Sequence, residues 1–319
     1  MTAPANTIRL GTRGSLLAKT QSQLIASAIE KLNPDVAVEL VIFKTQGDLI
    51  THKPLHEFGG KGLFTQELER ALLDGSIDFA VHSFKDVPVT MPLVDQTDLF
   101  FPSVPEREDP RDVMVSLKAK TINELPEGAK VGTGSLRRRS QLLATRPDLK
   151  IELIRGNIDT RLRKLREGQF DAVILAAAGL RRTGLFDEAE MVMLSTDEML
   201  PAPGQGALAL QCRRDNQRII DLLASVNDPE SQKCVVAERA IVQALKGDCH
   251  SPIAALAELS NHQITLRVAV GGRDGNPPVL RAAAIAGVGN EPDAVASAMQ
   301  ALTAQGVREI LAGNPAASR

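Results

Sequence analysis

The densest charge in the chain lies in residues 132–166, a stretch rich in arginine. It holds ten Lys or Arg against three acids, a local balance of +7 (10 − 3) in a chain whose formal net charge is −2. Guanidinium groups and the backbone N–H groups at helix starts both bind carboxylates and phosphates. The stretch therefore predicts a site for a ligand with several negative charges, and the alternative is a solvated helix face.

Two corners within this stretch follow short apolar runs that are typical of strands. Thr133, Ser135 and Arg137 follow the run at 130–133, and Arg155 follows the run at 151–154. Each corner opens a predicted helix, so both can present N–H groups to an anion. If the two strands are neighbours, both corners could face one cleft.

Two further groups of polar residues follow strand-like runs nearer the start of the chain. Arg13 and Ser15 follow the run at 8–10, where a plain turn is the alternative. Ser83, Lys85 and Asp86 follow the run at 77–81, and ligands of open α/β sheets bind beyond such strand ends. If that strand continues, alternation places Ser83 and Lys85 on the same side. A turn capped by Asp86 and a solvated Lys85 are the alternatives.

The elements that would position these residues alternate between strand and helix. Helices are predicted at 16–32, 64–73, 158–167, 216–226 and 229–245, and strands at 36–43, 112–117, 171–176 and 207–211. This alternation predicts an α/β fold with mixed, mostly parallel sheets. Residues 45–62 form a long, aperiodic loop that could close over a ligand.

Segments rich in Pro or Gly, at 102–110 and 200–206, predict two crossings between lobes and therefore a hinged cleft. Domain 1 is expected to comprise residues 1–104 and 201–223, and domain 2 residues 105–200. Strands at 253–259, 264–270 and 279–285 and a closing helix at 293–311 predict a small α+β C-terminal domain at 224–319. A new corner is expected at 179–182.

The three cysteines differ in their surroundings. Cys212 and Cys234 lie in apolar periodic segments and are expected to be inert core thiols. Cys249 lies in a predicted loop, where a thiol is accessible and can act as a nucleophile. The odd count and the spacing predict neither a disulfide framework nor a metal site, and they favour the reducing cytosol.

Composition excludes other classes. No apolar run approaches the roughly 18 residues of a membrane span, and the N-terminal residues lack a hydrophobic signal segment. Trp and Tyr are absent, which disfavours single-stranded nucleic-acid binding, because that usually needs aromatic stacking.

Seven motifs in order identify a resemblance. They are GGKGLFTQELERALL (59–73), VHSFKDVP (81–88), EREDPRDV (106–113), GTGSLRRRSQL (132–142), RGNIDTRLRKL (155–165), LPAPGQGAL (200–208) and GDCHSPIA (247–254). Together they closely resemble the porphobilinogen deaminase family, also called hydroxymethylbilane synthases, over nearly the whole length.

The resemblance implies two periplasmic-binding-protein-like lobes and a dipyrromethane cofactor joined by a thioether to Cys249. It implies a transferase of haem biosynthesis that condenses four porphobilinogen molecules, with Asp86 as the catalytic residue. It places cofactor- and substrate-binding roles on Arg13, Ser15, Ser83, Lys85, Arg107, Thr133, Ser135, Arg137, Arg138, Arg155, Arg161 and Arg182. We expect a cytoplasmic monomer with no metal, nucleic-acid or membrane partner.

The chain departs from the family pattern at several positions. Asp248 and Ser251 replace the usual Gly and Val around the cysteine, Gly134 replaces a common Ser, and Gln46 replaces a usual Arg. Two other functions stay open from the residues alone. One is an anion-binding module without chemistry, and the other is nucleic-acid binding through residues 137–166, which strong salt dependence would reveal.

Overall fold

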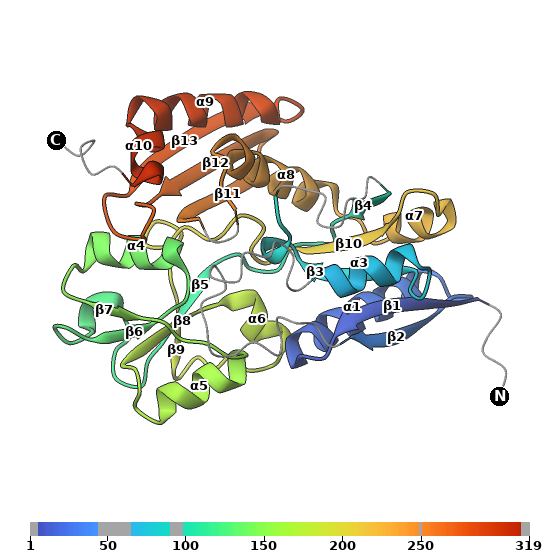
Figure 1. Ribbon diagram of the computed structural model, residues 1–319, viewed down its shortest axis with the longest axis horizontal. Coiled ribbons are helices and arrows are strands. Elements are labelled where there is room, and N and C mark those ends of the chain that lie inside the picture. The colour runs from blue at the N-terminus through green and yellow to red at the C-terminus, as the bar shows by residue number, and fades with distance from the viewer. Residues whose placement is uncertain (1–5, 44–64, 90–97, 249–250, 314–319) are drawn as a thin grey trace. The chain divides into compact units, whose positions relative to one another are not determined.

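The computed structural model describes residues 6–43, 65–89, 98–248 and 251–313 of the 319-residue chain (Figure 1). The chain divides into two compact units. The first unit comprises Met1–Glu108 and Ala207–Gln232, and the second comprises Asp109–Gly206 and Lys233–Arg319. The three-domain boundaries expected from the sequence stay predictions.

The first unit contains a five-stranded sheet in the order β2-β1-β3-β10-β4. Its strands are β1 (Thr7–Arg13), β2 (Ala37–Phe43), β3 (Phe79–Ser83), β4 (Leu99–Ser103) and β10 (Leu208–Arg213). Only β10 runs antiparallel to its neighbours, so the expected mixed, mostly parallel sheet is confirmed. The sheet packs one face on α1 (Leu16–Leu32) and α7 (Gln217–Ala224), and the other on α3 (Gln66–Leu73).

The second unit contains a sheet with the same spatial arrangement of parallel and antiparallel strands, in the order β7-β6-β8-β5-β9. Its strands are β5 (Asp112–Val115), β6 (Lys130–Gly132), β7 (Lys150–Glu152), β8 (Ala172–Ala176) and β9 (Met191–Met193). Here β5 is the antiparallel strand. The helices of this region are α4 (Leu136–Thr145), α5 (Ile158–Arg166) and α6 (Ala177–Arg182). Apolar cores on both faces of the sheet fix the strand ends.

The C-terminal region is a three-stranded antiparallel sheet with helices, as the sequence predicted. It comprises α8 (Pro229–Ala244), β11 (Ile253–Ser260), β12 (Gln263–Val270), β13 (Leu280–Gly287), α9 (Glu291–Ala304) and α10 (Val307–Ala312). The prediction of a single closing helix at 293–311 is wrong, because this segment forms two helices. The helix is interrupted at Gly306, which has a φ of 81° and immediately precedes α10, because glycine adopts this left-handed conformation without a steric penalty.

Two other expectations need correction. Residues 179–182 are not a new corner but the end of helix α6. Strand β4 was missed because Pro102 lies within it, and the sequence around this proline resembles a crossing. Because β4 is an edge strand, the missing N–H of proline costs little there.

Candidate functional site

In the first unit, the candidate residues follow the carboxyl ends of two neighbouring strands. Strands β1 and β3 pair in parallel, with Leu10 opposite Phe79. Arg13 ends β1, and Ser83 ends β3. Parallel strands end at one edge of a sheet, so these side chains gather where open α/β sheets bind ligands.

Local backbone structure explains how each residue is held. The Ser15 hydroxyl caps α1 by accepting a hydrogen bond from the Ala18 N–H at 3.3 Å. The Ser83 hydroxyl donates to Gln21 on the same helix at 3.2 Å. Strand β3 does not continue past Ser83, so the condition under which alternation would place Ser83 and Lys85 on the same side is not met.

Instead, Phe84–Asp86 form one 3-10 turn. Phe84 is buried, Lys85 is half-buried and Asp86 is exposed. Within the described residues, no hydrogen bond or ion pair engages the Asp86 carboxylate. This leaves both of its oxygens available to a ligand.

Three buried polar side chains, His82, Gln211 and Glu69, are joined by hydrogen bonds next to the carboxyl end of β3. His82 Nε2 lies 2.9 Å from Gln211 Oε1, and Gln211 Nε2 donates to Glu69 Oε1 at 3.3 Å. Because the Gln211 amide donates to Glu69, its oxygen accepts the His82 proton. Burial lowers the pKa of His82 to about 4, with Arg13 acting in the same direction, so the ring is neutral at pH 7. Burial also raises the pKa of Glu69.

In the second unit, the candidate residues follow three neighbouring parallel strands, β7, β6 and β8. Thr133 and Ser135 follow β6, Arg155 follows β7, and Arg182 ends the helix that follows β8. The two corners predicted from the sequence therefore lie on adjacent strands. Arg161, one turn into α5, donates from Nε to the Gly156 carbonyl at 2.8 Å.

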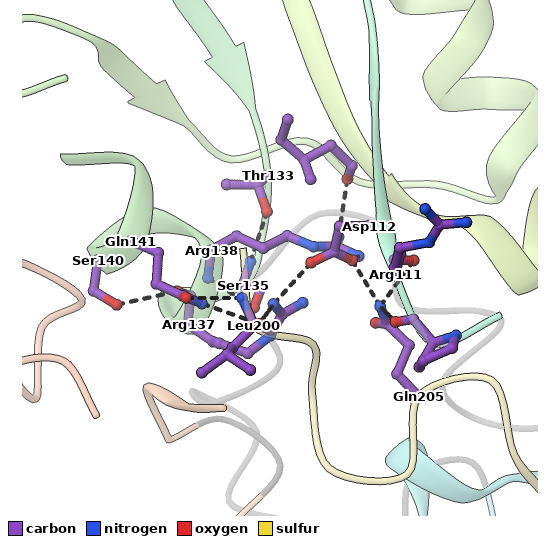
Figure 2. A network of polar contacts seen from close by, with 12 residues as sticks. Arg111, Asp112, Thr133, Ser135, Arg137, Arg138, Ser140, Gln141, Leu200 and Gln205 are labelled. Carbon is purple, nitrogen blue, oxygen red and sulfur yellow. Dashed lines mark hydrogen bonds and ion pairs between the residues drawn. The ribbon is translucent and has the colours of Figure 1, made fainter. Parts of the chain in front are cut away.

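Arg137 and Arg138 lie side by side on α4, and both bind the carboxylate of Asp112, as Figure 2 shows. Arg137 Nη1 lies 2.8 Å from Oδ2, and Arg138 Nη2 lies 2.8 Å from Oδ1. The side chain of Asp112 is 0% exposed, and those of the two arginines are 3% and 7% exposed. Burial opposes ionisation of Asp112, but the two guanidinium charges outweigh it and hold its pKa far below the usual range.

The second crossing joins the same network. Gln205 Nε2 donates to Asp112 Oδ1 at 2.8 Å and to the Pro110 carbonyl at 2.7 Å (Figure 2). The Leu200 N–H donates to Gln141 Oε1 at 2.9 Å, and Gln141 Nε2 donates to the Leu200 carbonyl at 3.1 Å. The second crossing is therefore bound to α4 through Leu200, and the first crossing is bound to the second through Pro110 and Gln205.

Sequence reasoning missed Asp112, Gln141 and Gln205. The signal for Asp112 lay in the acidic motif at 106–113, where it begins a buried strand. A carboxylate at the start of an apolar run needs a buried cation, and the arginine-rich stretch was the available source.

Three buried guanidinium nitrogens find no acceptor among the residues that the structure describes. They are the Nε atoms of Arg137, Arg138 and Arg155. Unpaired buried donors are costly, and an acidic ligand would supply acceptors for them. With two arginines and one aspartate, the Asp112 cluster also keeps one net positive charge. The residues present therefore fit a cofactor that carries carboxylates.

Some predicted residues lie elsewhere. Arg107 belongs to the first unit, where its N–H donates to the Ser231 hydroxyl at 3.0 Å. Cys249 and the loop at 45–62, which includes Gln46, lie outside the described residues. The residues flanking Cys249 bind one another: Ser251 N–H donates to the Asp248 carbonyl at 3.1 Å, and Asp248 N–H donates to Ser251 Oγ at 2.9 Å.

Other features bear on the class of site. Cys212 and Cys234 are buried free thiols, as expected. Across the described ranges, no group of three or more His, Cys, Asp or Glu could hold a metal ion. Nor does any helix in those ranges have the length and apolar character needed to cross a membrane.

Comparison with known proteins gives matches over most of the chain. Residues 8–221 match the family model described as porphobilinogen deaminase, dipyromethane cofactor binding domain, and residues 232–300 match the model of the porphobilinogen deaminase C-terminal domain. The porphobilinogen deaminase of Campylobacter hominis is 51% identical over 272 residues, covering 85% of this chain and 86% of that protein. The porphobilinogen deaminase of Acidithiobacillus ferrooxidans is 46% identical over 307 residues, covering 96% and 97%.

Among solved structures, a probable amino-acid ABC transporter extracellular-binding protein from Bacillus subtilis aligns with a TM-score of 0.43 and 14% identity. The alignment covers 69% of this chain and 90% of that one.

Proposed function

The chain belongs to the porphobilinogen deaminase family, and from this premise we propose that it is a hydroxymethylbilane synthase. This transferase joins four porphobilinogen molecules head to tail, with loss of one ammonia at each joining step. Hydrolysis then releases the linear tetrapyrrole. The observation that carries the proposal is the match of both family domains, in order, along one chain.

The proposed cofactor is a dipyrromethane held by a thioether to Cys249. When bound, it supplies a tethered primer whose free end receives the next pyrrole. The orphaned Nε atoms of Arg137, Arg138 and Arg155 support this, because the carboxylates of such a group would accept their hydrogen bonds. A tether also keeps the growing chain from leaving and raises its effective concentration.

Asp86 is the proposed catalytic residue. Loss of ammonia from porphobilinogen leaves a positively charged pyrrole, and a nearby carboxylate stabilises that charge as it develops. The Asp86 side chain is exposed and follows the end of β3 on a short turn, and the neutral, buried His82 lies within β3. Asp86 would also accept hydrogen bonds from the pyrrole N–H groups.

The remaining basic and hydroxyl residues are proposed to hold carboxylates. Each porphobilinogen adds two carboxylates, so the tethered chain becomes strongly acidic as it grows. Arginine holds carboxylates through two parallel hydrogen bonds. The proposed binding residues are Arg13, Ser15, Ser83, Lys85, Arg107, Thr133, Ser135, Arg137, Arg138, Arg155, Arg161 and Arg182.

The proposed setting is the cytosol, with the enzyme acting as a monomer. Two buried free thiols, Cys212 and Cys234, support a reducing compartment. The basic stretch is proposed not to bind nucleic acid, because several of its arginines pair within the protein. Arg146 binds Asp148 at 2.7 Å, and Arg163 binds Glu167 at 2.8 Å.

Intact-mass measurement tests the proposal. The purified protein should carry an adduct of dipyrromethane mass, and a Cys249→Ser variant should lack both the adduct and turnover. Cys234→Ser serves as the matched control and should retain both. Unmodified protein that turns over at the full rate would exclude the tether.

A limited supply of porphobilinogen tests the binding arginines. Arg155→Ala should stall elongation, so that partly extended chains accumulate on the protein. A product profile like that of the unaltered protein would remove Arg155 from this role. Binding of porphobilinogen without release of ammonia would instead favour the anion-binding module.

A further inference from the structure

Gly271 contacts both helix α4 and the segment that follows Cys249, the proposed attachment point of the cofactor. Gly271 comes directly after β12, and its backbone lies against Ser140 of α4. A Cβ added at Gly271 would lie 2.4 Å from Ser140 Cβ and 2.5 Å from Ser140 Oγ. Folded proteins essentially never show such distances, so with any side chain at position 271 either α4 or the segment of Gly271 must shift.

Gly271 also forms a hydrogen bond to the segment that follows Cys249. Its N–H donates to the Pro252 carbonyl at 2.9 Å. Pro252 lies three positions after Cys249, and Ser140 lies two positions after Arg138. The contact of Gly271 with Ser140 and Pro252, named here the Gly271 junction, therefore links the two segments within the second unit.

A neighbouring clamp fixes the orientation of this contact. Arg139 Nη2 donates to Asn276 Oδ1 at 2.9 Å, and Arg139 Nη1 donates to the Ile151 carbonyl at 3.2 Å. Asn276 is itself held by Asp274, whose Oδ1 accepts from the Asn276 N–H at 3.0 Å. Arg139 therefore ties the turn after β12 to both α4 and β7.

We propose that Gly271 is a positioning residue, which holds α4, with the paired guanidinium groups of Arg137 and Arg138, in place against Pro252 in the segment that follows the proposed attachment cysteine. The inference rests on the proposed function, because it takes Cys249 as the anchor. An oligomer fixed at one end meets the arginines only if their spacing from the anchor matches its carboxylates. A misplacement of about 1 Å can cost about a hundredfold in rate.

A steric rescue tests this inference in the holoenzyme. Gly271→Ala should still receive the cofactor but elongate about tenfold to a hundredfold more slowly. Its tethered intermediates should accumulate at a chain length where the unaltered protein shows none. Ser140→Gly removes both atoms that the new methyl group would meet. The double variant should therefore regain most of the elongation rate.

A matched control separates positioning from general damage. Gly287 also has no positive φ, and a Cβ there would meet only Asn290 Nδ2, at 3.7 Å. Gly287→Ala should match the unaltered protein in elongation and in its intermediates. Intact mass after limited substrate gives the distribution of intermediates, and thermal unfolding gives the loss of stability separately.

Three outcomes would overturn the inference. They are normal elongation by Gly271→Ala, slowing that the double variant does not relieve, and a lower Tm with an unchanged distribution of intermediates. Failure of the proposed function is distinguishable, because the unaltered protein would then carry no adduct.

Discussion

Asp86 and Asp112 lie at corresponding edges of two sheets with the same spatial arrangement of parallel and antiparallel strands, yet their surroundings are opposite. Asp86 follows the end of β3 and is exposed. Asp112 pairs with Ala176, the last residue of β8, and its side chain is fully buried. In the first sheet, Leu208 takes the place of Asp112 at the start of the antiparallel strand, opposite Ser83.

The difference separates two uses of a carboxylate. Asp112 is saturated by two guanidinium groups and the Gln205 amide, so it holds cations that belong to the protein. Asp86 has no such partner among the described residues, and its proposed role is to stabilise a cation that forms during the reaction. Substitutions at the two positions should therefore affect different measurements.

Asp112→Ala should have the largest effect. It leaves the guanidinium groups of Arg137 and Arg138 buried without their counter-charge, and breaking such a pair costs about 3–5 kcal/mol. Denaturant unfolding measures this loss. Asp148→Ala is the control: it breaks a more exposed pair with Arg146 and should lower the free energy of unfolding much less. Equal losses in the two variants would contradict the comparison.

Asp86→Asn should have the second-largest effect, and it should lower the rate of turnover. Removing one stabiliser of developing charge costs about 100- to 1,000-fold in rate. An exposed substitution should change the free energy of unfolding by no more than about 0.5 kcal/mol. Asp35→Asn, another exposed position of the same unit, should change neither quantity. An unchanged rate for Asp86→Asn would remove Asp86 from catalysis.

Mild acid should destabilise the His82–Gln211–Glu69 network before it affects the Asp112 cluster. The pKa of His82 is about 4 when folded and 6.5 when unfolded, so the unfolded state binds more protons between these values. This contribution to stability is complete above pH 6.5 and is lost as the pH falls toward 4. Glu69 acts in the opposite direction, because its pKa is raised by burial. The Asp112 contribution is lost only in stronger acid, since its pKa is depressed.

His82→Gln tests this difference, because Glu69 is present in both proteins and its contribution largely cancels. The unaltered protein should lose roughly 2 kcal/mol more than the variant between pH 7 and pH 5, as linkage requires for the cited pKa of about 4. Denaturant unfolding at each pH measures the loss. Parallel pH profiles for the two proteins would refute a buried neutral His82.

The smallest effect should come from an exposed member of the arginine-rich stretch. Arg163 pairs with Glu167 one turn along α5, with side chains that are 64% and 43% exposed. Arg163→Ala should cost about 0.3–0.5 kcal/mol in unfolding experiments and leave turnover unchanged. A loss of turnover would show that Arg163, which is not among the proposed binding residues, also acts on the ligand.

Local patterns predicted most of the elements, because helix periodicity and strand ends depend on nearby residues. The helix at 16–32 matches α1, and both corners of the arginine-rich stretch lie on adjacent strands. The Asp112 network could not be predicted this way. Arg137, Arg138 and Gln205 lie 25, 26 and 93 positions from Asp112 along the chain, and only the folded sheet brings them together.

The resemblance named candidate residues but not their surroundings. It gave Arg137 and Arg138 as ligand-binding groups without showing that both also hold an internal carboxylate. It gave no indication of Gly271, because a close backbone approach leaves no mark in composition or charge.

The position of β10 has a consequence for synthesis on the ribosome. Strand β10 lies between β3 and β4, but its residues are translated about 100 positions after β4 ends. At roughly 5–20 residues per second, β4 waits about 5–20 seconds for its neighbour. The second sheet can close during this interval, whereas the first must leave a gap between strands in the nascent chain. Pro102 in β4 removes one N–H donor from that waiting edge, which limits pairing with the wrong chain.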